Sequence, residues 1–385
     1  MSVALVIWAW LAATIQAIGA VLLIHGVRQI RRLREVQVPS SRTWPSVTVV
    51  IAARNEEHSI EPALQSVLQL DYPALKILVV NDRSTDNTGA ILDRWACQDP
   101  RLHVVHVTEL PPGWLGKNHA LHQGAMTATS EWILFTDADV LFAPGTLKKA
   151  IVYAENHALD LLAAFPEIRM PTLLLQIFAL TFEILFFLYF QPWRARNPNS
   201  RSYVGVGAFN LVRRSSYWDV GGHAPIAMRP DDDVKLGQLF KLNGKRIDVV
   251  DGVGELSVPW YASLREVFLG LEKNLYAGVD YRLSIIAISS LGALLFYFAP
   301  FVLVFFTRGA TQWGFAIASG ILLALATAVA TATRMRPWAG VGFPLGVLLF
   351  ILIQWRTTAL TFIRGGIQWR GTFYSLDQLR ANRLT

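Results

Sequence analysis

The sequence is poor in cysteine and in charged side chains. Cys97 is the single cysteine among 385 residues, which excludes an internal disulfide and agrees with a reducing compartment. Charged residues make up only 16% of the chain and hydrophobic residues 53%, which is unusual for a soluble protein. No repeat or low-complexity stretch stands out. This composition favours a membrane protein of two or three structural units.

Several sequence signals of nucleotide and nucleic-acid binding are missing. The β-branched run 47–53 leads into Arg-Asn-Glu-Glu, so no Gly-x-Gly-x-x-Gly turn follows it, and there is no P-loop. This disfavours a Rossmann dehydrogenase. The net charge of +7 comes from arginines beside apolar segments, with no basic stripe interleaved with aromatics. We therefore expect contact with an anionic lipid bilayer and no nucleic acid.

The first apolar segment is predicted to be a retained membrane anchor. Val3–Ile24 carries no charge and is about long enough to cross a bilayer. A signal peptide would have a basic region before the apolar run, and none is present. Arginines follow instead, from Arg28 to Arg34, and the positive-inside rule then places the next domain in the cytoplasm. We expect a multi-pass protein of the cell membrane.

Three apolar stretches near the C-terminus leave the membrane topology open. Ile285–Thr307 and Gly314–Thr333 are predicted spans, whereas Val341–Ile363 is interrupted by Gln354, Trp355 and Arg356. If all three cross, the basic tail lies outside the cytoplasm, against the positive-inside rule. A re-entrant or interfacial third helix would remove the conflict.

Two other segments are predicted to lie at the membrane surface. Leu173–Phe190 is apolar but contains Glu183 and falls inside the soluble domain, so we interpret it as an interfacial segment walling a lipid entry groove. Ser263–Tyr276 has the pattern of an amphipathic helix, whose simplest role is to lie on the bilayer. Lys273, on this helix, is also a candidate acceptor-binding residue.

Between about Trp44 and Asp280 the pattern alternates between strand and helix. Strands are predicted over Val47–Ala53, Lys76–Asp82, Leu102–Val107 and Trp132–Thr136, and helices begin near Ser59 and span Thr85–Gln98. Alternation of this kind predicts an α/β fold with a mostly parallel sheet. Ligands of such sheets bind beyond the carboxyl ends of the strands.

Polar residues stand at those strand ends and predict one site. Arg54, Asn55 and Glu56 follow the first strand, and Asp82 ends the second. Asp137 and Asp139 follow a later strand, two residues apart, so that they can point to the same side. Two such acids repel each other, and a hard divalent cation that bridges to a diphosphate would resolve the conflict. A solvated acidic turn is the alternative.

Three adjacent acids, Asp231 to Asp233, precede a helical pattern. Acids are common in the first turn of a helix because they interact favourably with its dipole. Three in a row exceed what capping needs, and mutual repulsion would raise a pKa towards the range of a general base.

At this point the sequence resembles a family 2 glycosyltransferase with a GT-A fold, over Val47 to about Lys245. The motifs that carry the likeness are VIAARNEE, VVNDRSTDNT, GWLGKNHALHQG, DAD, GVGAFNLVRR with the later Gly-Gly, and PDDDVKLG. The resemblance implies an inverting, metal-dependent transferase that takes its sugar from a nucleotide donor, with a UDP-hexose favoured.

The resemblance also implies roles for individual residues. The residues implied to bind the donor are Ala53, Arg54, Asn55, Glu56, Asp82 (nucleobase), Lys117 (diphosphate), Asp137 and Ala138. Lys117 belongs to GWLGKNHALHQG, which resembles the donor-loop segment of the family. Asp139, assisted by Asp137, is implied to bind Mg²⁺ or Mn²⁺. Gly207, Ala208 and His223 lie on the acceptor side. Asp233 is the expected general base, with Asp232 as the alternative.

Within this family the chain looks most similar to membrane enzymes that glycosylate ceramide, hopanoid-associated lipids or carotenoid acids. The segments LREVFLGLEKNLYAG and GGIQWRGTFYSL carry this narrower likeness. The Q/R-x-x-R-W motif that polysaccharide synthases and ceramide glucosyltransferases carry before their membrane helices is absent. Processive polymerisation and a ceramide acceptor are therefore disfavoured.

We therefore expect transfer of a sugar to a membrane lipid by a cytoplasmic catalytic domain. A polyprenyl-phosphate acceptor and a non-catalytic scaffold that binds a nucleotide sugar stay as alternatives. The expected parts are an anchor (1–27), a GT-A domain (44–260), an interfacial helix (261–282), C-terminal membrane helices (283–366) and a basic tail (367–385).

Overall fold

The computed structural model describes residues 2–384, which divide into two compact units. One unit, called here the α/β unit, contains Ile30–Glu167, Pro192–Pro259 and the end of the chain from Ala381. The other, the helical unit, contains the N-terminal helix, Ile168–Gln191 and Trp260–Arg380. The chain therefore passes repeatedly from one unit to the other.

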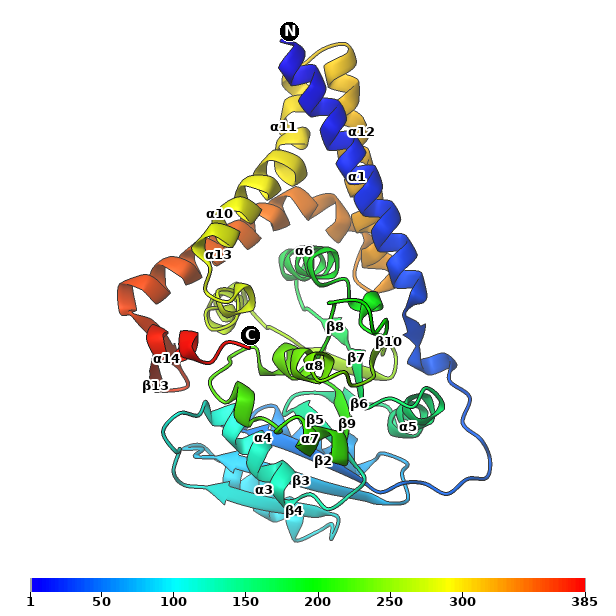
Figure 1. Ribbon diagram of the computed structural model, residues 1–385, viewed down its shortest axis with the longest axis vertical. Helices are drawn as coiled ribbons and strands as arrows, with labels where there is room; N and C mark the ends of the chain where they lie inside the picture. The colour runs from blue at the N-terminus through cyan, green and yellow to red at the C-terminus, as the bar shows by residue number, and fades with distance from the viewer. Residues whose placement is uncertain (1, 385) are drawn as a thin grey trace. The chain divides into compact units, whose positions relative to one another are not determined.

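An eight-stranded sheet forms the centre of the α/β unit (Figure 1). The strands lie in the order β1 (Arg31–Arg32), β10 (Ile247–Asp251), β7 (Leu161–Phe165), β9 (Asn210–Arg213), β5 (Trp132–Asp137), β2 (Val47–Ala53), β3 (Leu75–Asp82) and β4 (Leu102–Val107). Neighbours are parallel except for β9, which runs antiparallel to both β5 and β7. The predicted mostly parallel α/β sheet is confirmed.

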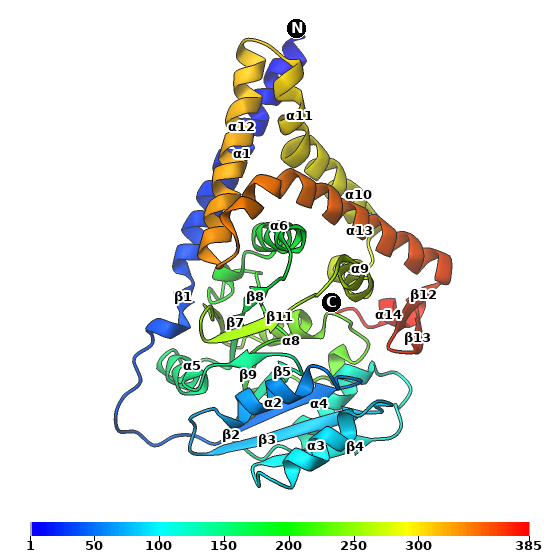
Figure 2. The same cartoon turned by 180° about the vertical axis from the view of Figure 1, so that it is seen from behind.

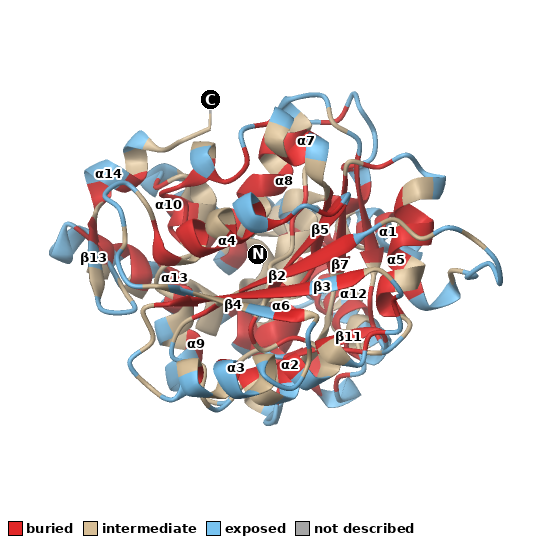
Figure 3. Cartoon of the chain, turned by 90° about the horizontal axis from the view of Figure 1, so that it is seen from below, coloured by how far each residue is buried: buried red, intermediate tan, exposed pale blue. Residues whose placement is uncertain are grey.

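Helices cover both faces of this sheet, because its strands bury side chains in two directions. On β2, Val49 and Ile51 join one core cluster, and Val50 joins the other. Helices α2 (Ile60–Leu68), α3 (Thr88–Ala96) and α5 (Thr146–Asn156) contribute to the first cluster, and α4 (Gly116–Thr127), α7 (Arg214–Asp219) and α8 (Asp232–Leu242) to the second. The central strands are accordingly buried (Figure 3).

Most strand bounds agree with the sequence prediction, and one helix begins later. The helix expected from Thr85 starts at Thr88, because the preceding turn has other hydrogen bonds. The Thr85 backbone N–H donates to Asn55 Oδ1 at 2.8 Å, and the Thr88 N–H donates to Asp86 Oδ1 at 3.0 Å. Three short strands complete the elements of this region: β6 (Leu141–Phe142), β8 (Glu167–Arg169) and β11 (Leu256–Pro259).

The helical unit holds the long apolar helices. Within residues 2–384, five segments are helical, long and apolar enough to cross a membrane: Val3–Gln29, Leu173–Arg194, Leu283–Phe306, Ala310–Ala332 and Pro337–Arg364. The first and fourth are the helices α1 and α12, and the second contains α6 (Leu173–Phe190). The third contains α10 (Leu283–Gly292) and α11 (Ala299–Phe306), and the fifth contains α13 (Phe343–Arg364). They are compatible with a membrane protein. The remaining elements are α9 (Leu264–Leu271), the β12–β13 pair (Gly366–Trp369, Thr372–Ser375) and α14 (Leu376–Ala381).

A proline explains the irregular turn between α10 and α11. Residues Ala293–Phe298 form a π-helical turn, and Pro300 follows it. Proline has no N–H, so the carbonyl four residues earlier loses its helical donor. That carbonyl belongs to Phe296, and it accepts a hydrogen bond from the Gln16 side chain of α1 at 2.7 Å. A buried polar residue of the N-terminal helix thereby satisfies a backbone group of the C-terminal helices.

We expect Gly124→Ala to destabilise the α/β unit. An added Cβ would lie 2.3 Å from Val50 Cγ1, so α4 would have to move away from β2. Overpacking of this kind costs about 1–3 kcal/mol, and the melting temperature of the full-length protein in detergent should fall. The matched control is Gly145→Ala, where the added Cβ meets only the flexible end of Lys149 at 3.7 Å. Equal melting temperatures would contradict the close helix–strand contact.

Candidate active site

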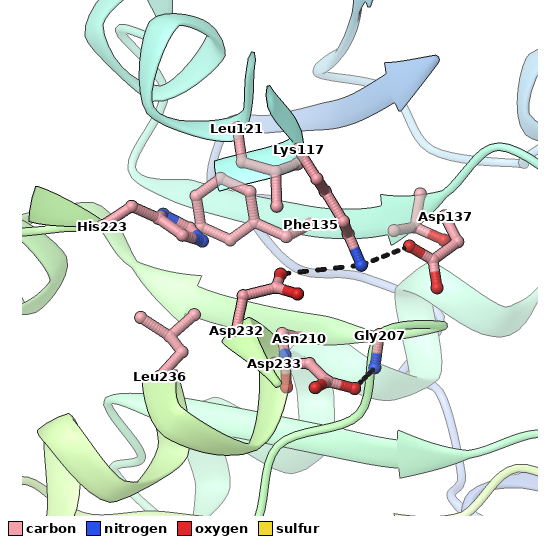
Figure 4. Close-up of a pocket in the computed structure, with 11 residues that line it drawn as sticks. Lys117, Leu121, Phe135, Asp137, Gly207, Asn210, His223, Asp232, Asp233 and Leu236 are labelled. Carbon is pink, nitrogen blue, oxygen red and sulfur yellow. Dashed lines mark hydrogen bonds and ion pairs between the residues drawn. The ribbon is translucent and has the colours of Figure 1, made fainter. Parts of the chain in front are cut away.

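A small pocket in the α/β unit brings together the predicted motifs (Figure 4). It lies at the end of β5, beside the first turns of α4 and α8. Its lining residues are Lys117, Leu121, Phe135, Thr136, Asp137, Gly207, Asn210, His223, Asp232, Asp233 and Leu236. The list includes candidates for donor binding, acceptor binding and catalysis, although they lie far apart in the sequence.

Lys117 lies in the first turn of α4, in a segment that the resemblance treats as a loop. The loop assignment is wrong, because the helix begins at Gly116. The ammonium of Lys117 lies 2.7 Å from Asp137 Oδ1 and 3.5 Å from Asp232 Oδ2 (Figure 4). Burial alone would lower the pKa of Lys117, but the nearby carboxylates outweigh it and raise the pKa above its ordinary value. The pocket therefore contains a fixed positive charge.

Asp137 and Asp139 form an acidic pair at the end of β5, as predicted. Burial, followed by the charges of Asp137 and Glu56, raises the pKa of Asp139 to about 7. Ala138 between them is buried in the core, which fixes the backbone of the motif. The two acids are thus held close enough to oppose each other's ionisation.

This pair is a candidate site for a divalent cation. Its carboxylate oxygens are hard ligands, and a cation would relieve the repulsion that raises the pKa of Asp139. Within residues 2–384, no three histidine, cysteine or acidic side chains form a group that could hold a metal alone. A cation here would therefore take further oxygen ligands from a bound molecule.

The turns after β2 and β3 are tied together by side-chain hydrogen bonds. The Asn55 N–H donates to Ser84 Oγ at 3.0 Å, and the Glu56 N–H donates to Thr88 Oγ1 at 2.8 Å. Asn55 has a φ of 54°, in the left-handed region that asparagine tolerates better than most residues. Ala53, buried, ends β2 just before this turn. The predicted donor residues of the two strand ends are thus neighbours in space.

Asp82 ends β3 and is already paired with arginine side chains. Arg83 donates two hydrogen bonds to its carboxylate, at 2.7 and 2.9 Å, and Arg54 lies 3.7 Å away. Gly116 is needed here, because an added Cβ would lie 2.3 Å from Asp82 Oδ2. The nucleobase-binding role of Asp82 stays a prediction.

The three adjacent acids have three different environments. Asp231 pairs with the buried Arg229 guanidinium through two contacts of 2.9 Å, so its role is structural. Asp232 is buried and faces Lys117. Asp233 is partly exposed, and burial of its carboxyl raises its pKa. It accepts hydrogen bonds from the N–H groups of Gly207 at 2.7 Å and Val234 at 2.8 Å.

Glycines allow the segment before β9 to approach the acids. An added Cβ on Gly205 would lie 1.8 Å from the Asp233 carbonyl oxygen, and one on Gly207 would lie 2.7 Å from Asp137 Oδ2. The Ala208 carbonyl accepts from Thr136 Oγ1 at 2.7 Å, which joins the segment to β5. Gly207 therefore lines the pocket between Asp137 and Asp233, and Ala208, next to it, is buried against β5.

The other two predicted acceptor residues lie in different places. His223 is buried and hydrogen-bonds through Nδ1 to the Tyr217 hydroxyl at 2.7 Å. Burial lowers the pKa of His223 to about 3, which keeps the imidazole neutral. Lys273 belongs to the helical unit, where its ammonium lies 4.1 Å from the centre of the Trp369 ring. Their acceptor roles stay predictions.

Asn118 is a positioning residue that the sequence analysis missed. Its buried side-chain amide donates to the carbonyls of Ile226, Ala227 and Arg229, at 2.8, 3.2 and 2.9 Å. It thereby holds the loop before the acids against the helix that carries Lys117. No local pattern marks an asparagine for this task, because its partners lie more than a hundred residues away.

Comparison with known proteins identifies the domain. Residues 48–221 match the family model Glycosyl transferase family 2. This segment is a family 2 glycosyltransferase domain. The match includes the DAD motif and ends before α8, so the assignment of Asp231 to Asp233 rests on the geometry of the pocket.

Two relatives of this glycosyltransferase domain are the 4,4'-diaponeurosporenoate glycosyltransferases of Staphylococcus aureus strains bovine RF122 / ET3-1 and MRSA252. They are 25% and 24% identical over 247 residues, which cover 63% of this chain. The alignment spans 64% of the length of each relative.

A solved structure supports the fold. The mannosyltransferase PcManGT from Pyrobaculum calidifontis, in complex with GDP-Man and Mn²⁺, matches with a TM-score of 0.53 and 19% sequence identity. The match covers 93% of this chain and 99% of that chain. The expected GT-A-like fold of the glycosyltransferase domain is confirmed.

We expect Asn118→Ala to loosen the loop before the acids. Three buried carbonyls would lose a donor, and a buried unsatisfied group typically costs about 1–3 kcal/mol. The melting temperature in detergent should fall, and proteolysis near residues 225–231 should become faster. Asn243→Ala is the control, since Asn243 is exposed and its side-chain amide donates to the carbonyl of Leu239, four residues earlier at the end of α8. A variant as stable as this control would show that Asn118 does not hold the loop.

Proposed function

We propose that this chain is an inverting glycosyltransferase that moves a sugar from a nucleotide-sugar donor to the hydroxyl or carboxyl group of a membrane lipid. One observation carries the proposal. Within a family 2 glycosyltransferase domain, Lys117 lies between the DAD motif and the acids at the start of α8, with Asp233 partly exposed beside them. Cationic and acidic groups are thus arranged for a leaving diphosphate and for a nucleophile.

The donor would lie along the carboxyl ends of β2, β3 and β5. Asn55, Glu56 and Asp82 stand where the nucleoside would bind, and Lys117 and Asp137 stand where the diphosphate would bind. A UDP-hexose is the proposed donor. The solved neighbour was captured with GDP-Man, so guanosine donors belong in any test.

Asp137 and Asp139 would hold Mg²⁺ or Mn²⁺, since their carboxylates are hard ligands held close together. When bound, such a cation neutralises charge on the departing diphosphate. Lys117 would move its ammonium from Asp137 to a phosphate oxygen, and it would remain protonated because its pKa is raised. The ammonium and the cation would together offset part of the negative charge of the diphosphate.

Asp233 would act as the general base. As the acceptor oxygen attacks the anomeric carbon, its proton passes to the Asp233 carboxylate. The bond from that carbon to the diphosphate oxygen breaks, and the electron pair leaves with the nucleoside diphosphate. The raised pKa of Asp233 brings it towards the range useful for a base, and the N–H groups of Gly207 and Val234 fix its orientation.

The lipid acceptor is supported by the helical unit and by the relatives. The long apolar helices are compatible with a chain that lies in or on a bilayer, where an apolar acceptor would be concentrated. The relatives are named for an apolar carboxylic acid, diaponeurosporenoate. A carotenoid acid or a similar amphipathic lipid is the proposed acceptor class.

We expect Asp233→Asn to lower the rate of sugar transfer to a hydroxyl acceptor by about 100-fold or more, because the amide cannot take the acceptor proton. Transfer would be measured with purified protein and lipid extract at saturating donor. Asp71→Asn is the control, since the Asp71 carboxylate is largely exposed and forms a surface ion pair with Lys148. Full activity of Asp233→Asn and of Asp232→Asn would mean that the nucleophile is already ionised, as in a polyprenyl phosphate or a carboxylate.

We expect membranes that contain the protein to transfer radiolabel from one nucleotide sugar of a UDP, GDP and dTDP panel into organic-extractable lipid. EDTA and Asp139→Asn should each abolish the transfer, because both remove the proposed cation. Label in a water-soluble polymer would point to a polysaccharide synthase. Absence of label with every donor, together with intact donor binding, would favour a non-catalytic scaffold.

A further inference from the structure

The connectivity of the sheet limits the path of α6. Strands β5 and β7 precede this helix in the sequence and β9 follows it, yet β9 pairs with both of them. One hydrogen-bonded sheet cannot have strands on the two sides of a bilayer. A single helix that leaves the sheet and returns to it therefore cannot cross the membrane. α6 must stay on one side, although its length and composition would suit a span.

The end of the chain sets a second limit. The Asn382 side chain accepts from the Met228 N–H at 2.9 Å and donates to the Pro225 carbonyl at 3.2 Å. Leu384 packs against the core cluster that contains Tyr217 and Phe240. The chain therefore leaves the α/β unit after Pro259 and rejoins it at Ala381. The number of membrane crossings between these two points must be even, so three helices cannot all cross.

Charge indicates that α13 is the helix that does not cross. It carries Arg356, and Glu272 forms ion pairs with both Arg356 at 3.1 Å and Arg364 at 2.5 Å. Arginine is costly at the centre of a bilayer but acceptable at its surface. The α11–α12 turn contains one arginine, Arg308, whereas arginines stand at both ends of α13 (Arg334, Arg336, Arg364, Arg370). The positive-inside rule then places both ends of α13 on one side.

The arrangement within the helical unit agrees with this assignment. Figures 1 and 2 show α1 and α12 side by side along much of their length, with α13 running across their direction. The first turns of α1 and the α11–α12 turn lie close together in both views. α13 crosses α6 at Gly342 and Gly346, where an added Cβ would clash with Ile177 and Thr181.

We propose that α1, the continuous α10–α11 helix and α12 cross the membrane, whereas α6 and α13 lie in the membrane surface on the side of the α/β unit. The partner of this surface is the lipid bilayer. On α13, Leu345, Leu348 and Leu352 are exposed at helical spacing and form an apolar stripe, and buried threonines occupy another face. Such a stripe enters the acyl-chain boundary without taking Arg356 into the bilayer centre.

Cysteine accessibility in sealed vesicles tests the proposal on the full-length protein. Cys97 is exposed in the α/β unit and serves as the natural reference for that side. In a Cys97→Ser background, single cysteines are introduced as Asn199→Cys, Ala310→Cys, Trp338→Cys or Asp377→Cys, all at exposed positions. Labelling with a membrane-impermeant maleimide is compared in right-side-out and inverted vesicles and normalised to labelling in detergent.

We expect the cysteines at 199, 338 and 377 to react in the same vesicle orientation as Cys97, and the cysteine at 310 to react in the opposite one. Reaction at 199 from the opposite side would overturn the surface position of α6. Opposite sides for 338 and 377 would mean that α13 crosses. Reaction of the cysteine at 310 from the side of Cys97 would also refute the topology. So would any position whose cysteine reacts only after detergent is added. Arg336→Cys repeats the test of the α12–α13 turn if Trp338→Cys is poorly inserted.

Discussion

The ammonium of Lys117 is the interaction on which the rest of the site depends. It lies between Asp137 at the end of β5 and Asp232 at the start of α8, and so it joins the DAD motif to the acids of the second motif. Without a cation between them, these acids would repel each other in a partly buried pocket. The helix that places Lys117 is itself fixed by Gly116, which fits against Asp82, and by Gly124, which fits against Val50.

The parts of the fold that could be predicted are those governed by local pattern. Val47–Ala53 and Leu102–Val107 are strands with the bounds that their β-branched residues indicate. The position of the acids at strand ends also followed from sequence, because parallel strands align their carboxyl ends. The donor segment was assigned as a loop by likeness, although Asn118 to Leu121 continue the first turns of a helix.

Other features depend on contacts between distant segments and could not be predicted. Nothing local distinguishes Asp231, Asp232 and Asp233, whose environments are set by Arg229, Lys117 and the Gly207 backbone. The segments that contain α6 and α12 likewise have the same mean hydropathy, 2.1, so hydropathy does not distinguish a surface helix from a span. Only the pairing of β9 with β5 and β7, and the contacts of Asn382, show where the chain must return.

The contacts of Asn382 also bear on the order in which the protein is made. The loop Pro225–Met228 is held on one side by Asn118 and on the other by a residue three positions from the end of the chain. A chain emerging from the ribosome folds from its N-terminal part onwards, so the glycosyltransferase domain can form its sheet early. Its loop beside the acids gains the contacts with Asn382 only after the five long apolar helices, which all precede this residue, have been synthesised. The loop beside the acids is thus completed later than the sheet that carries the DAD motif.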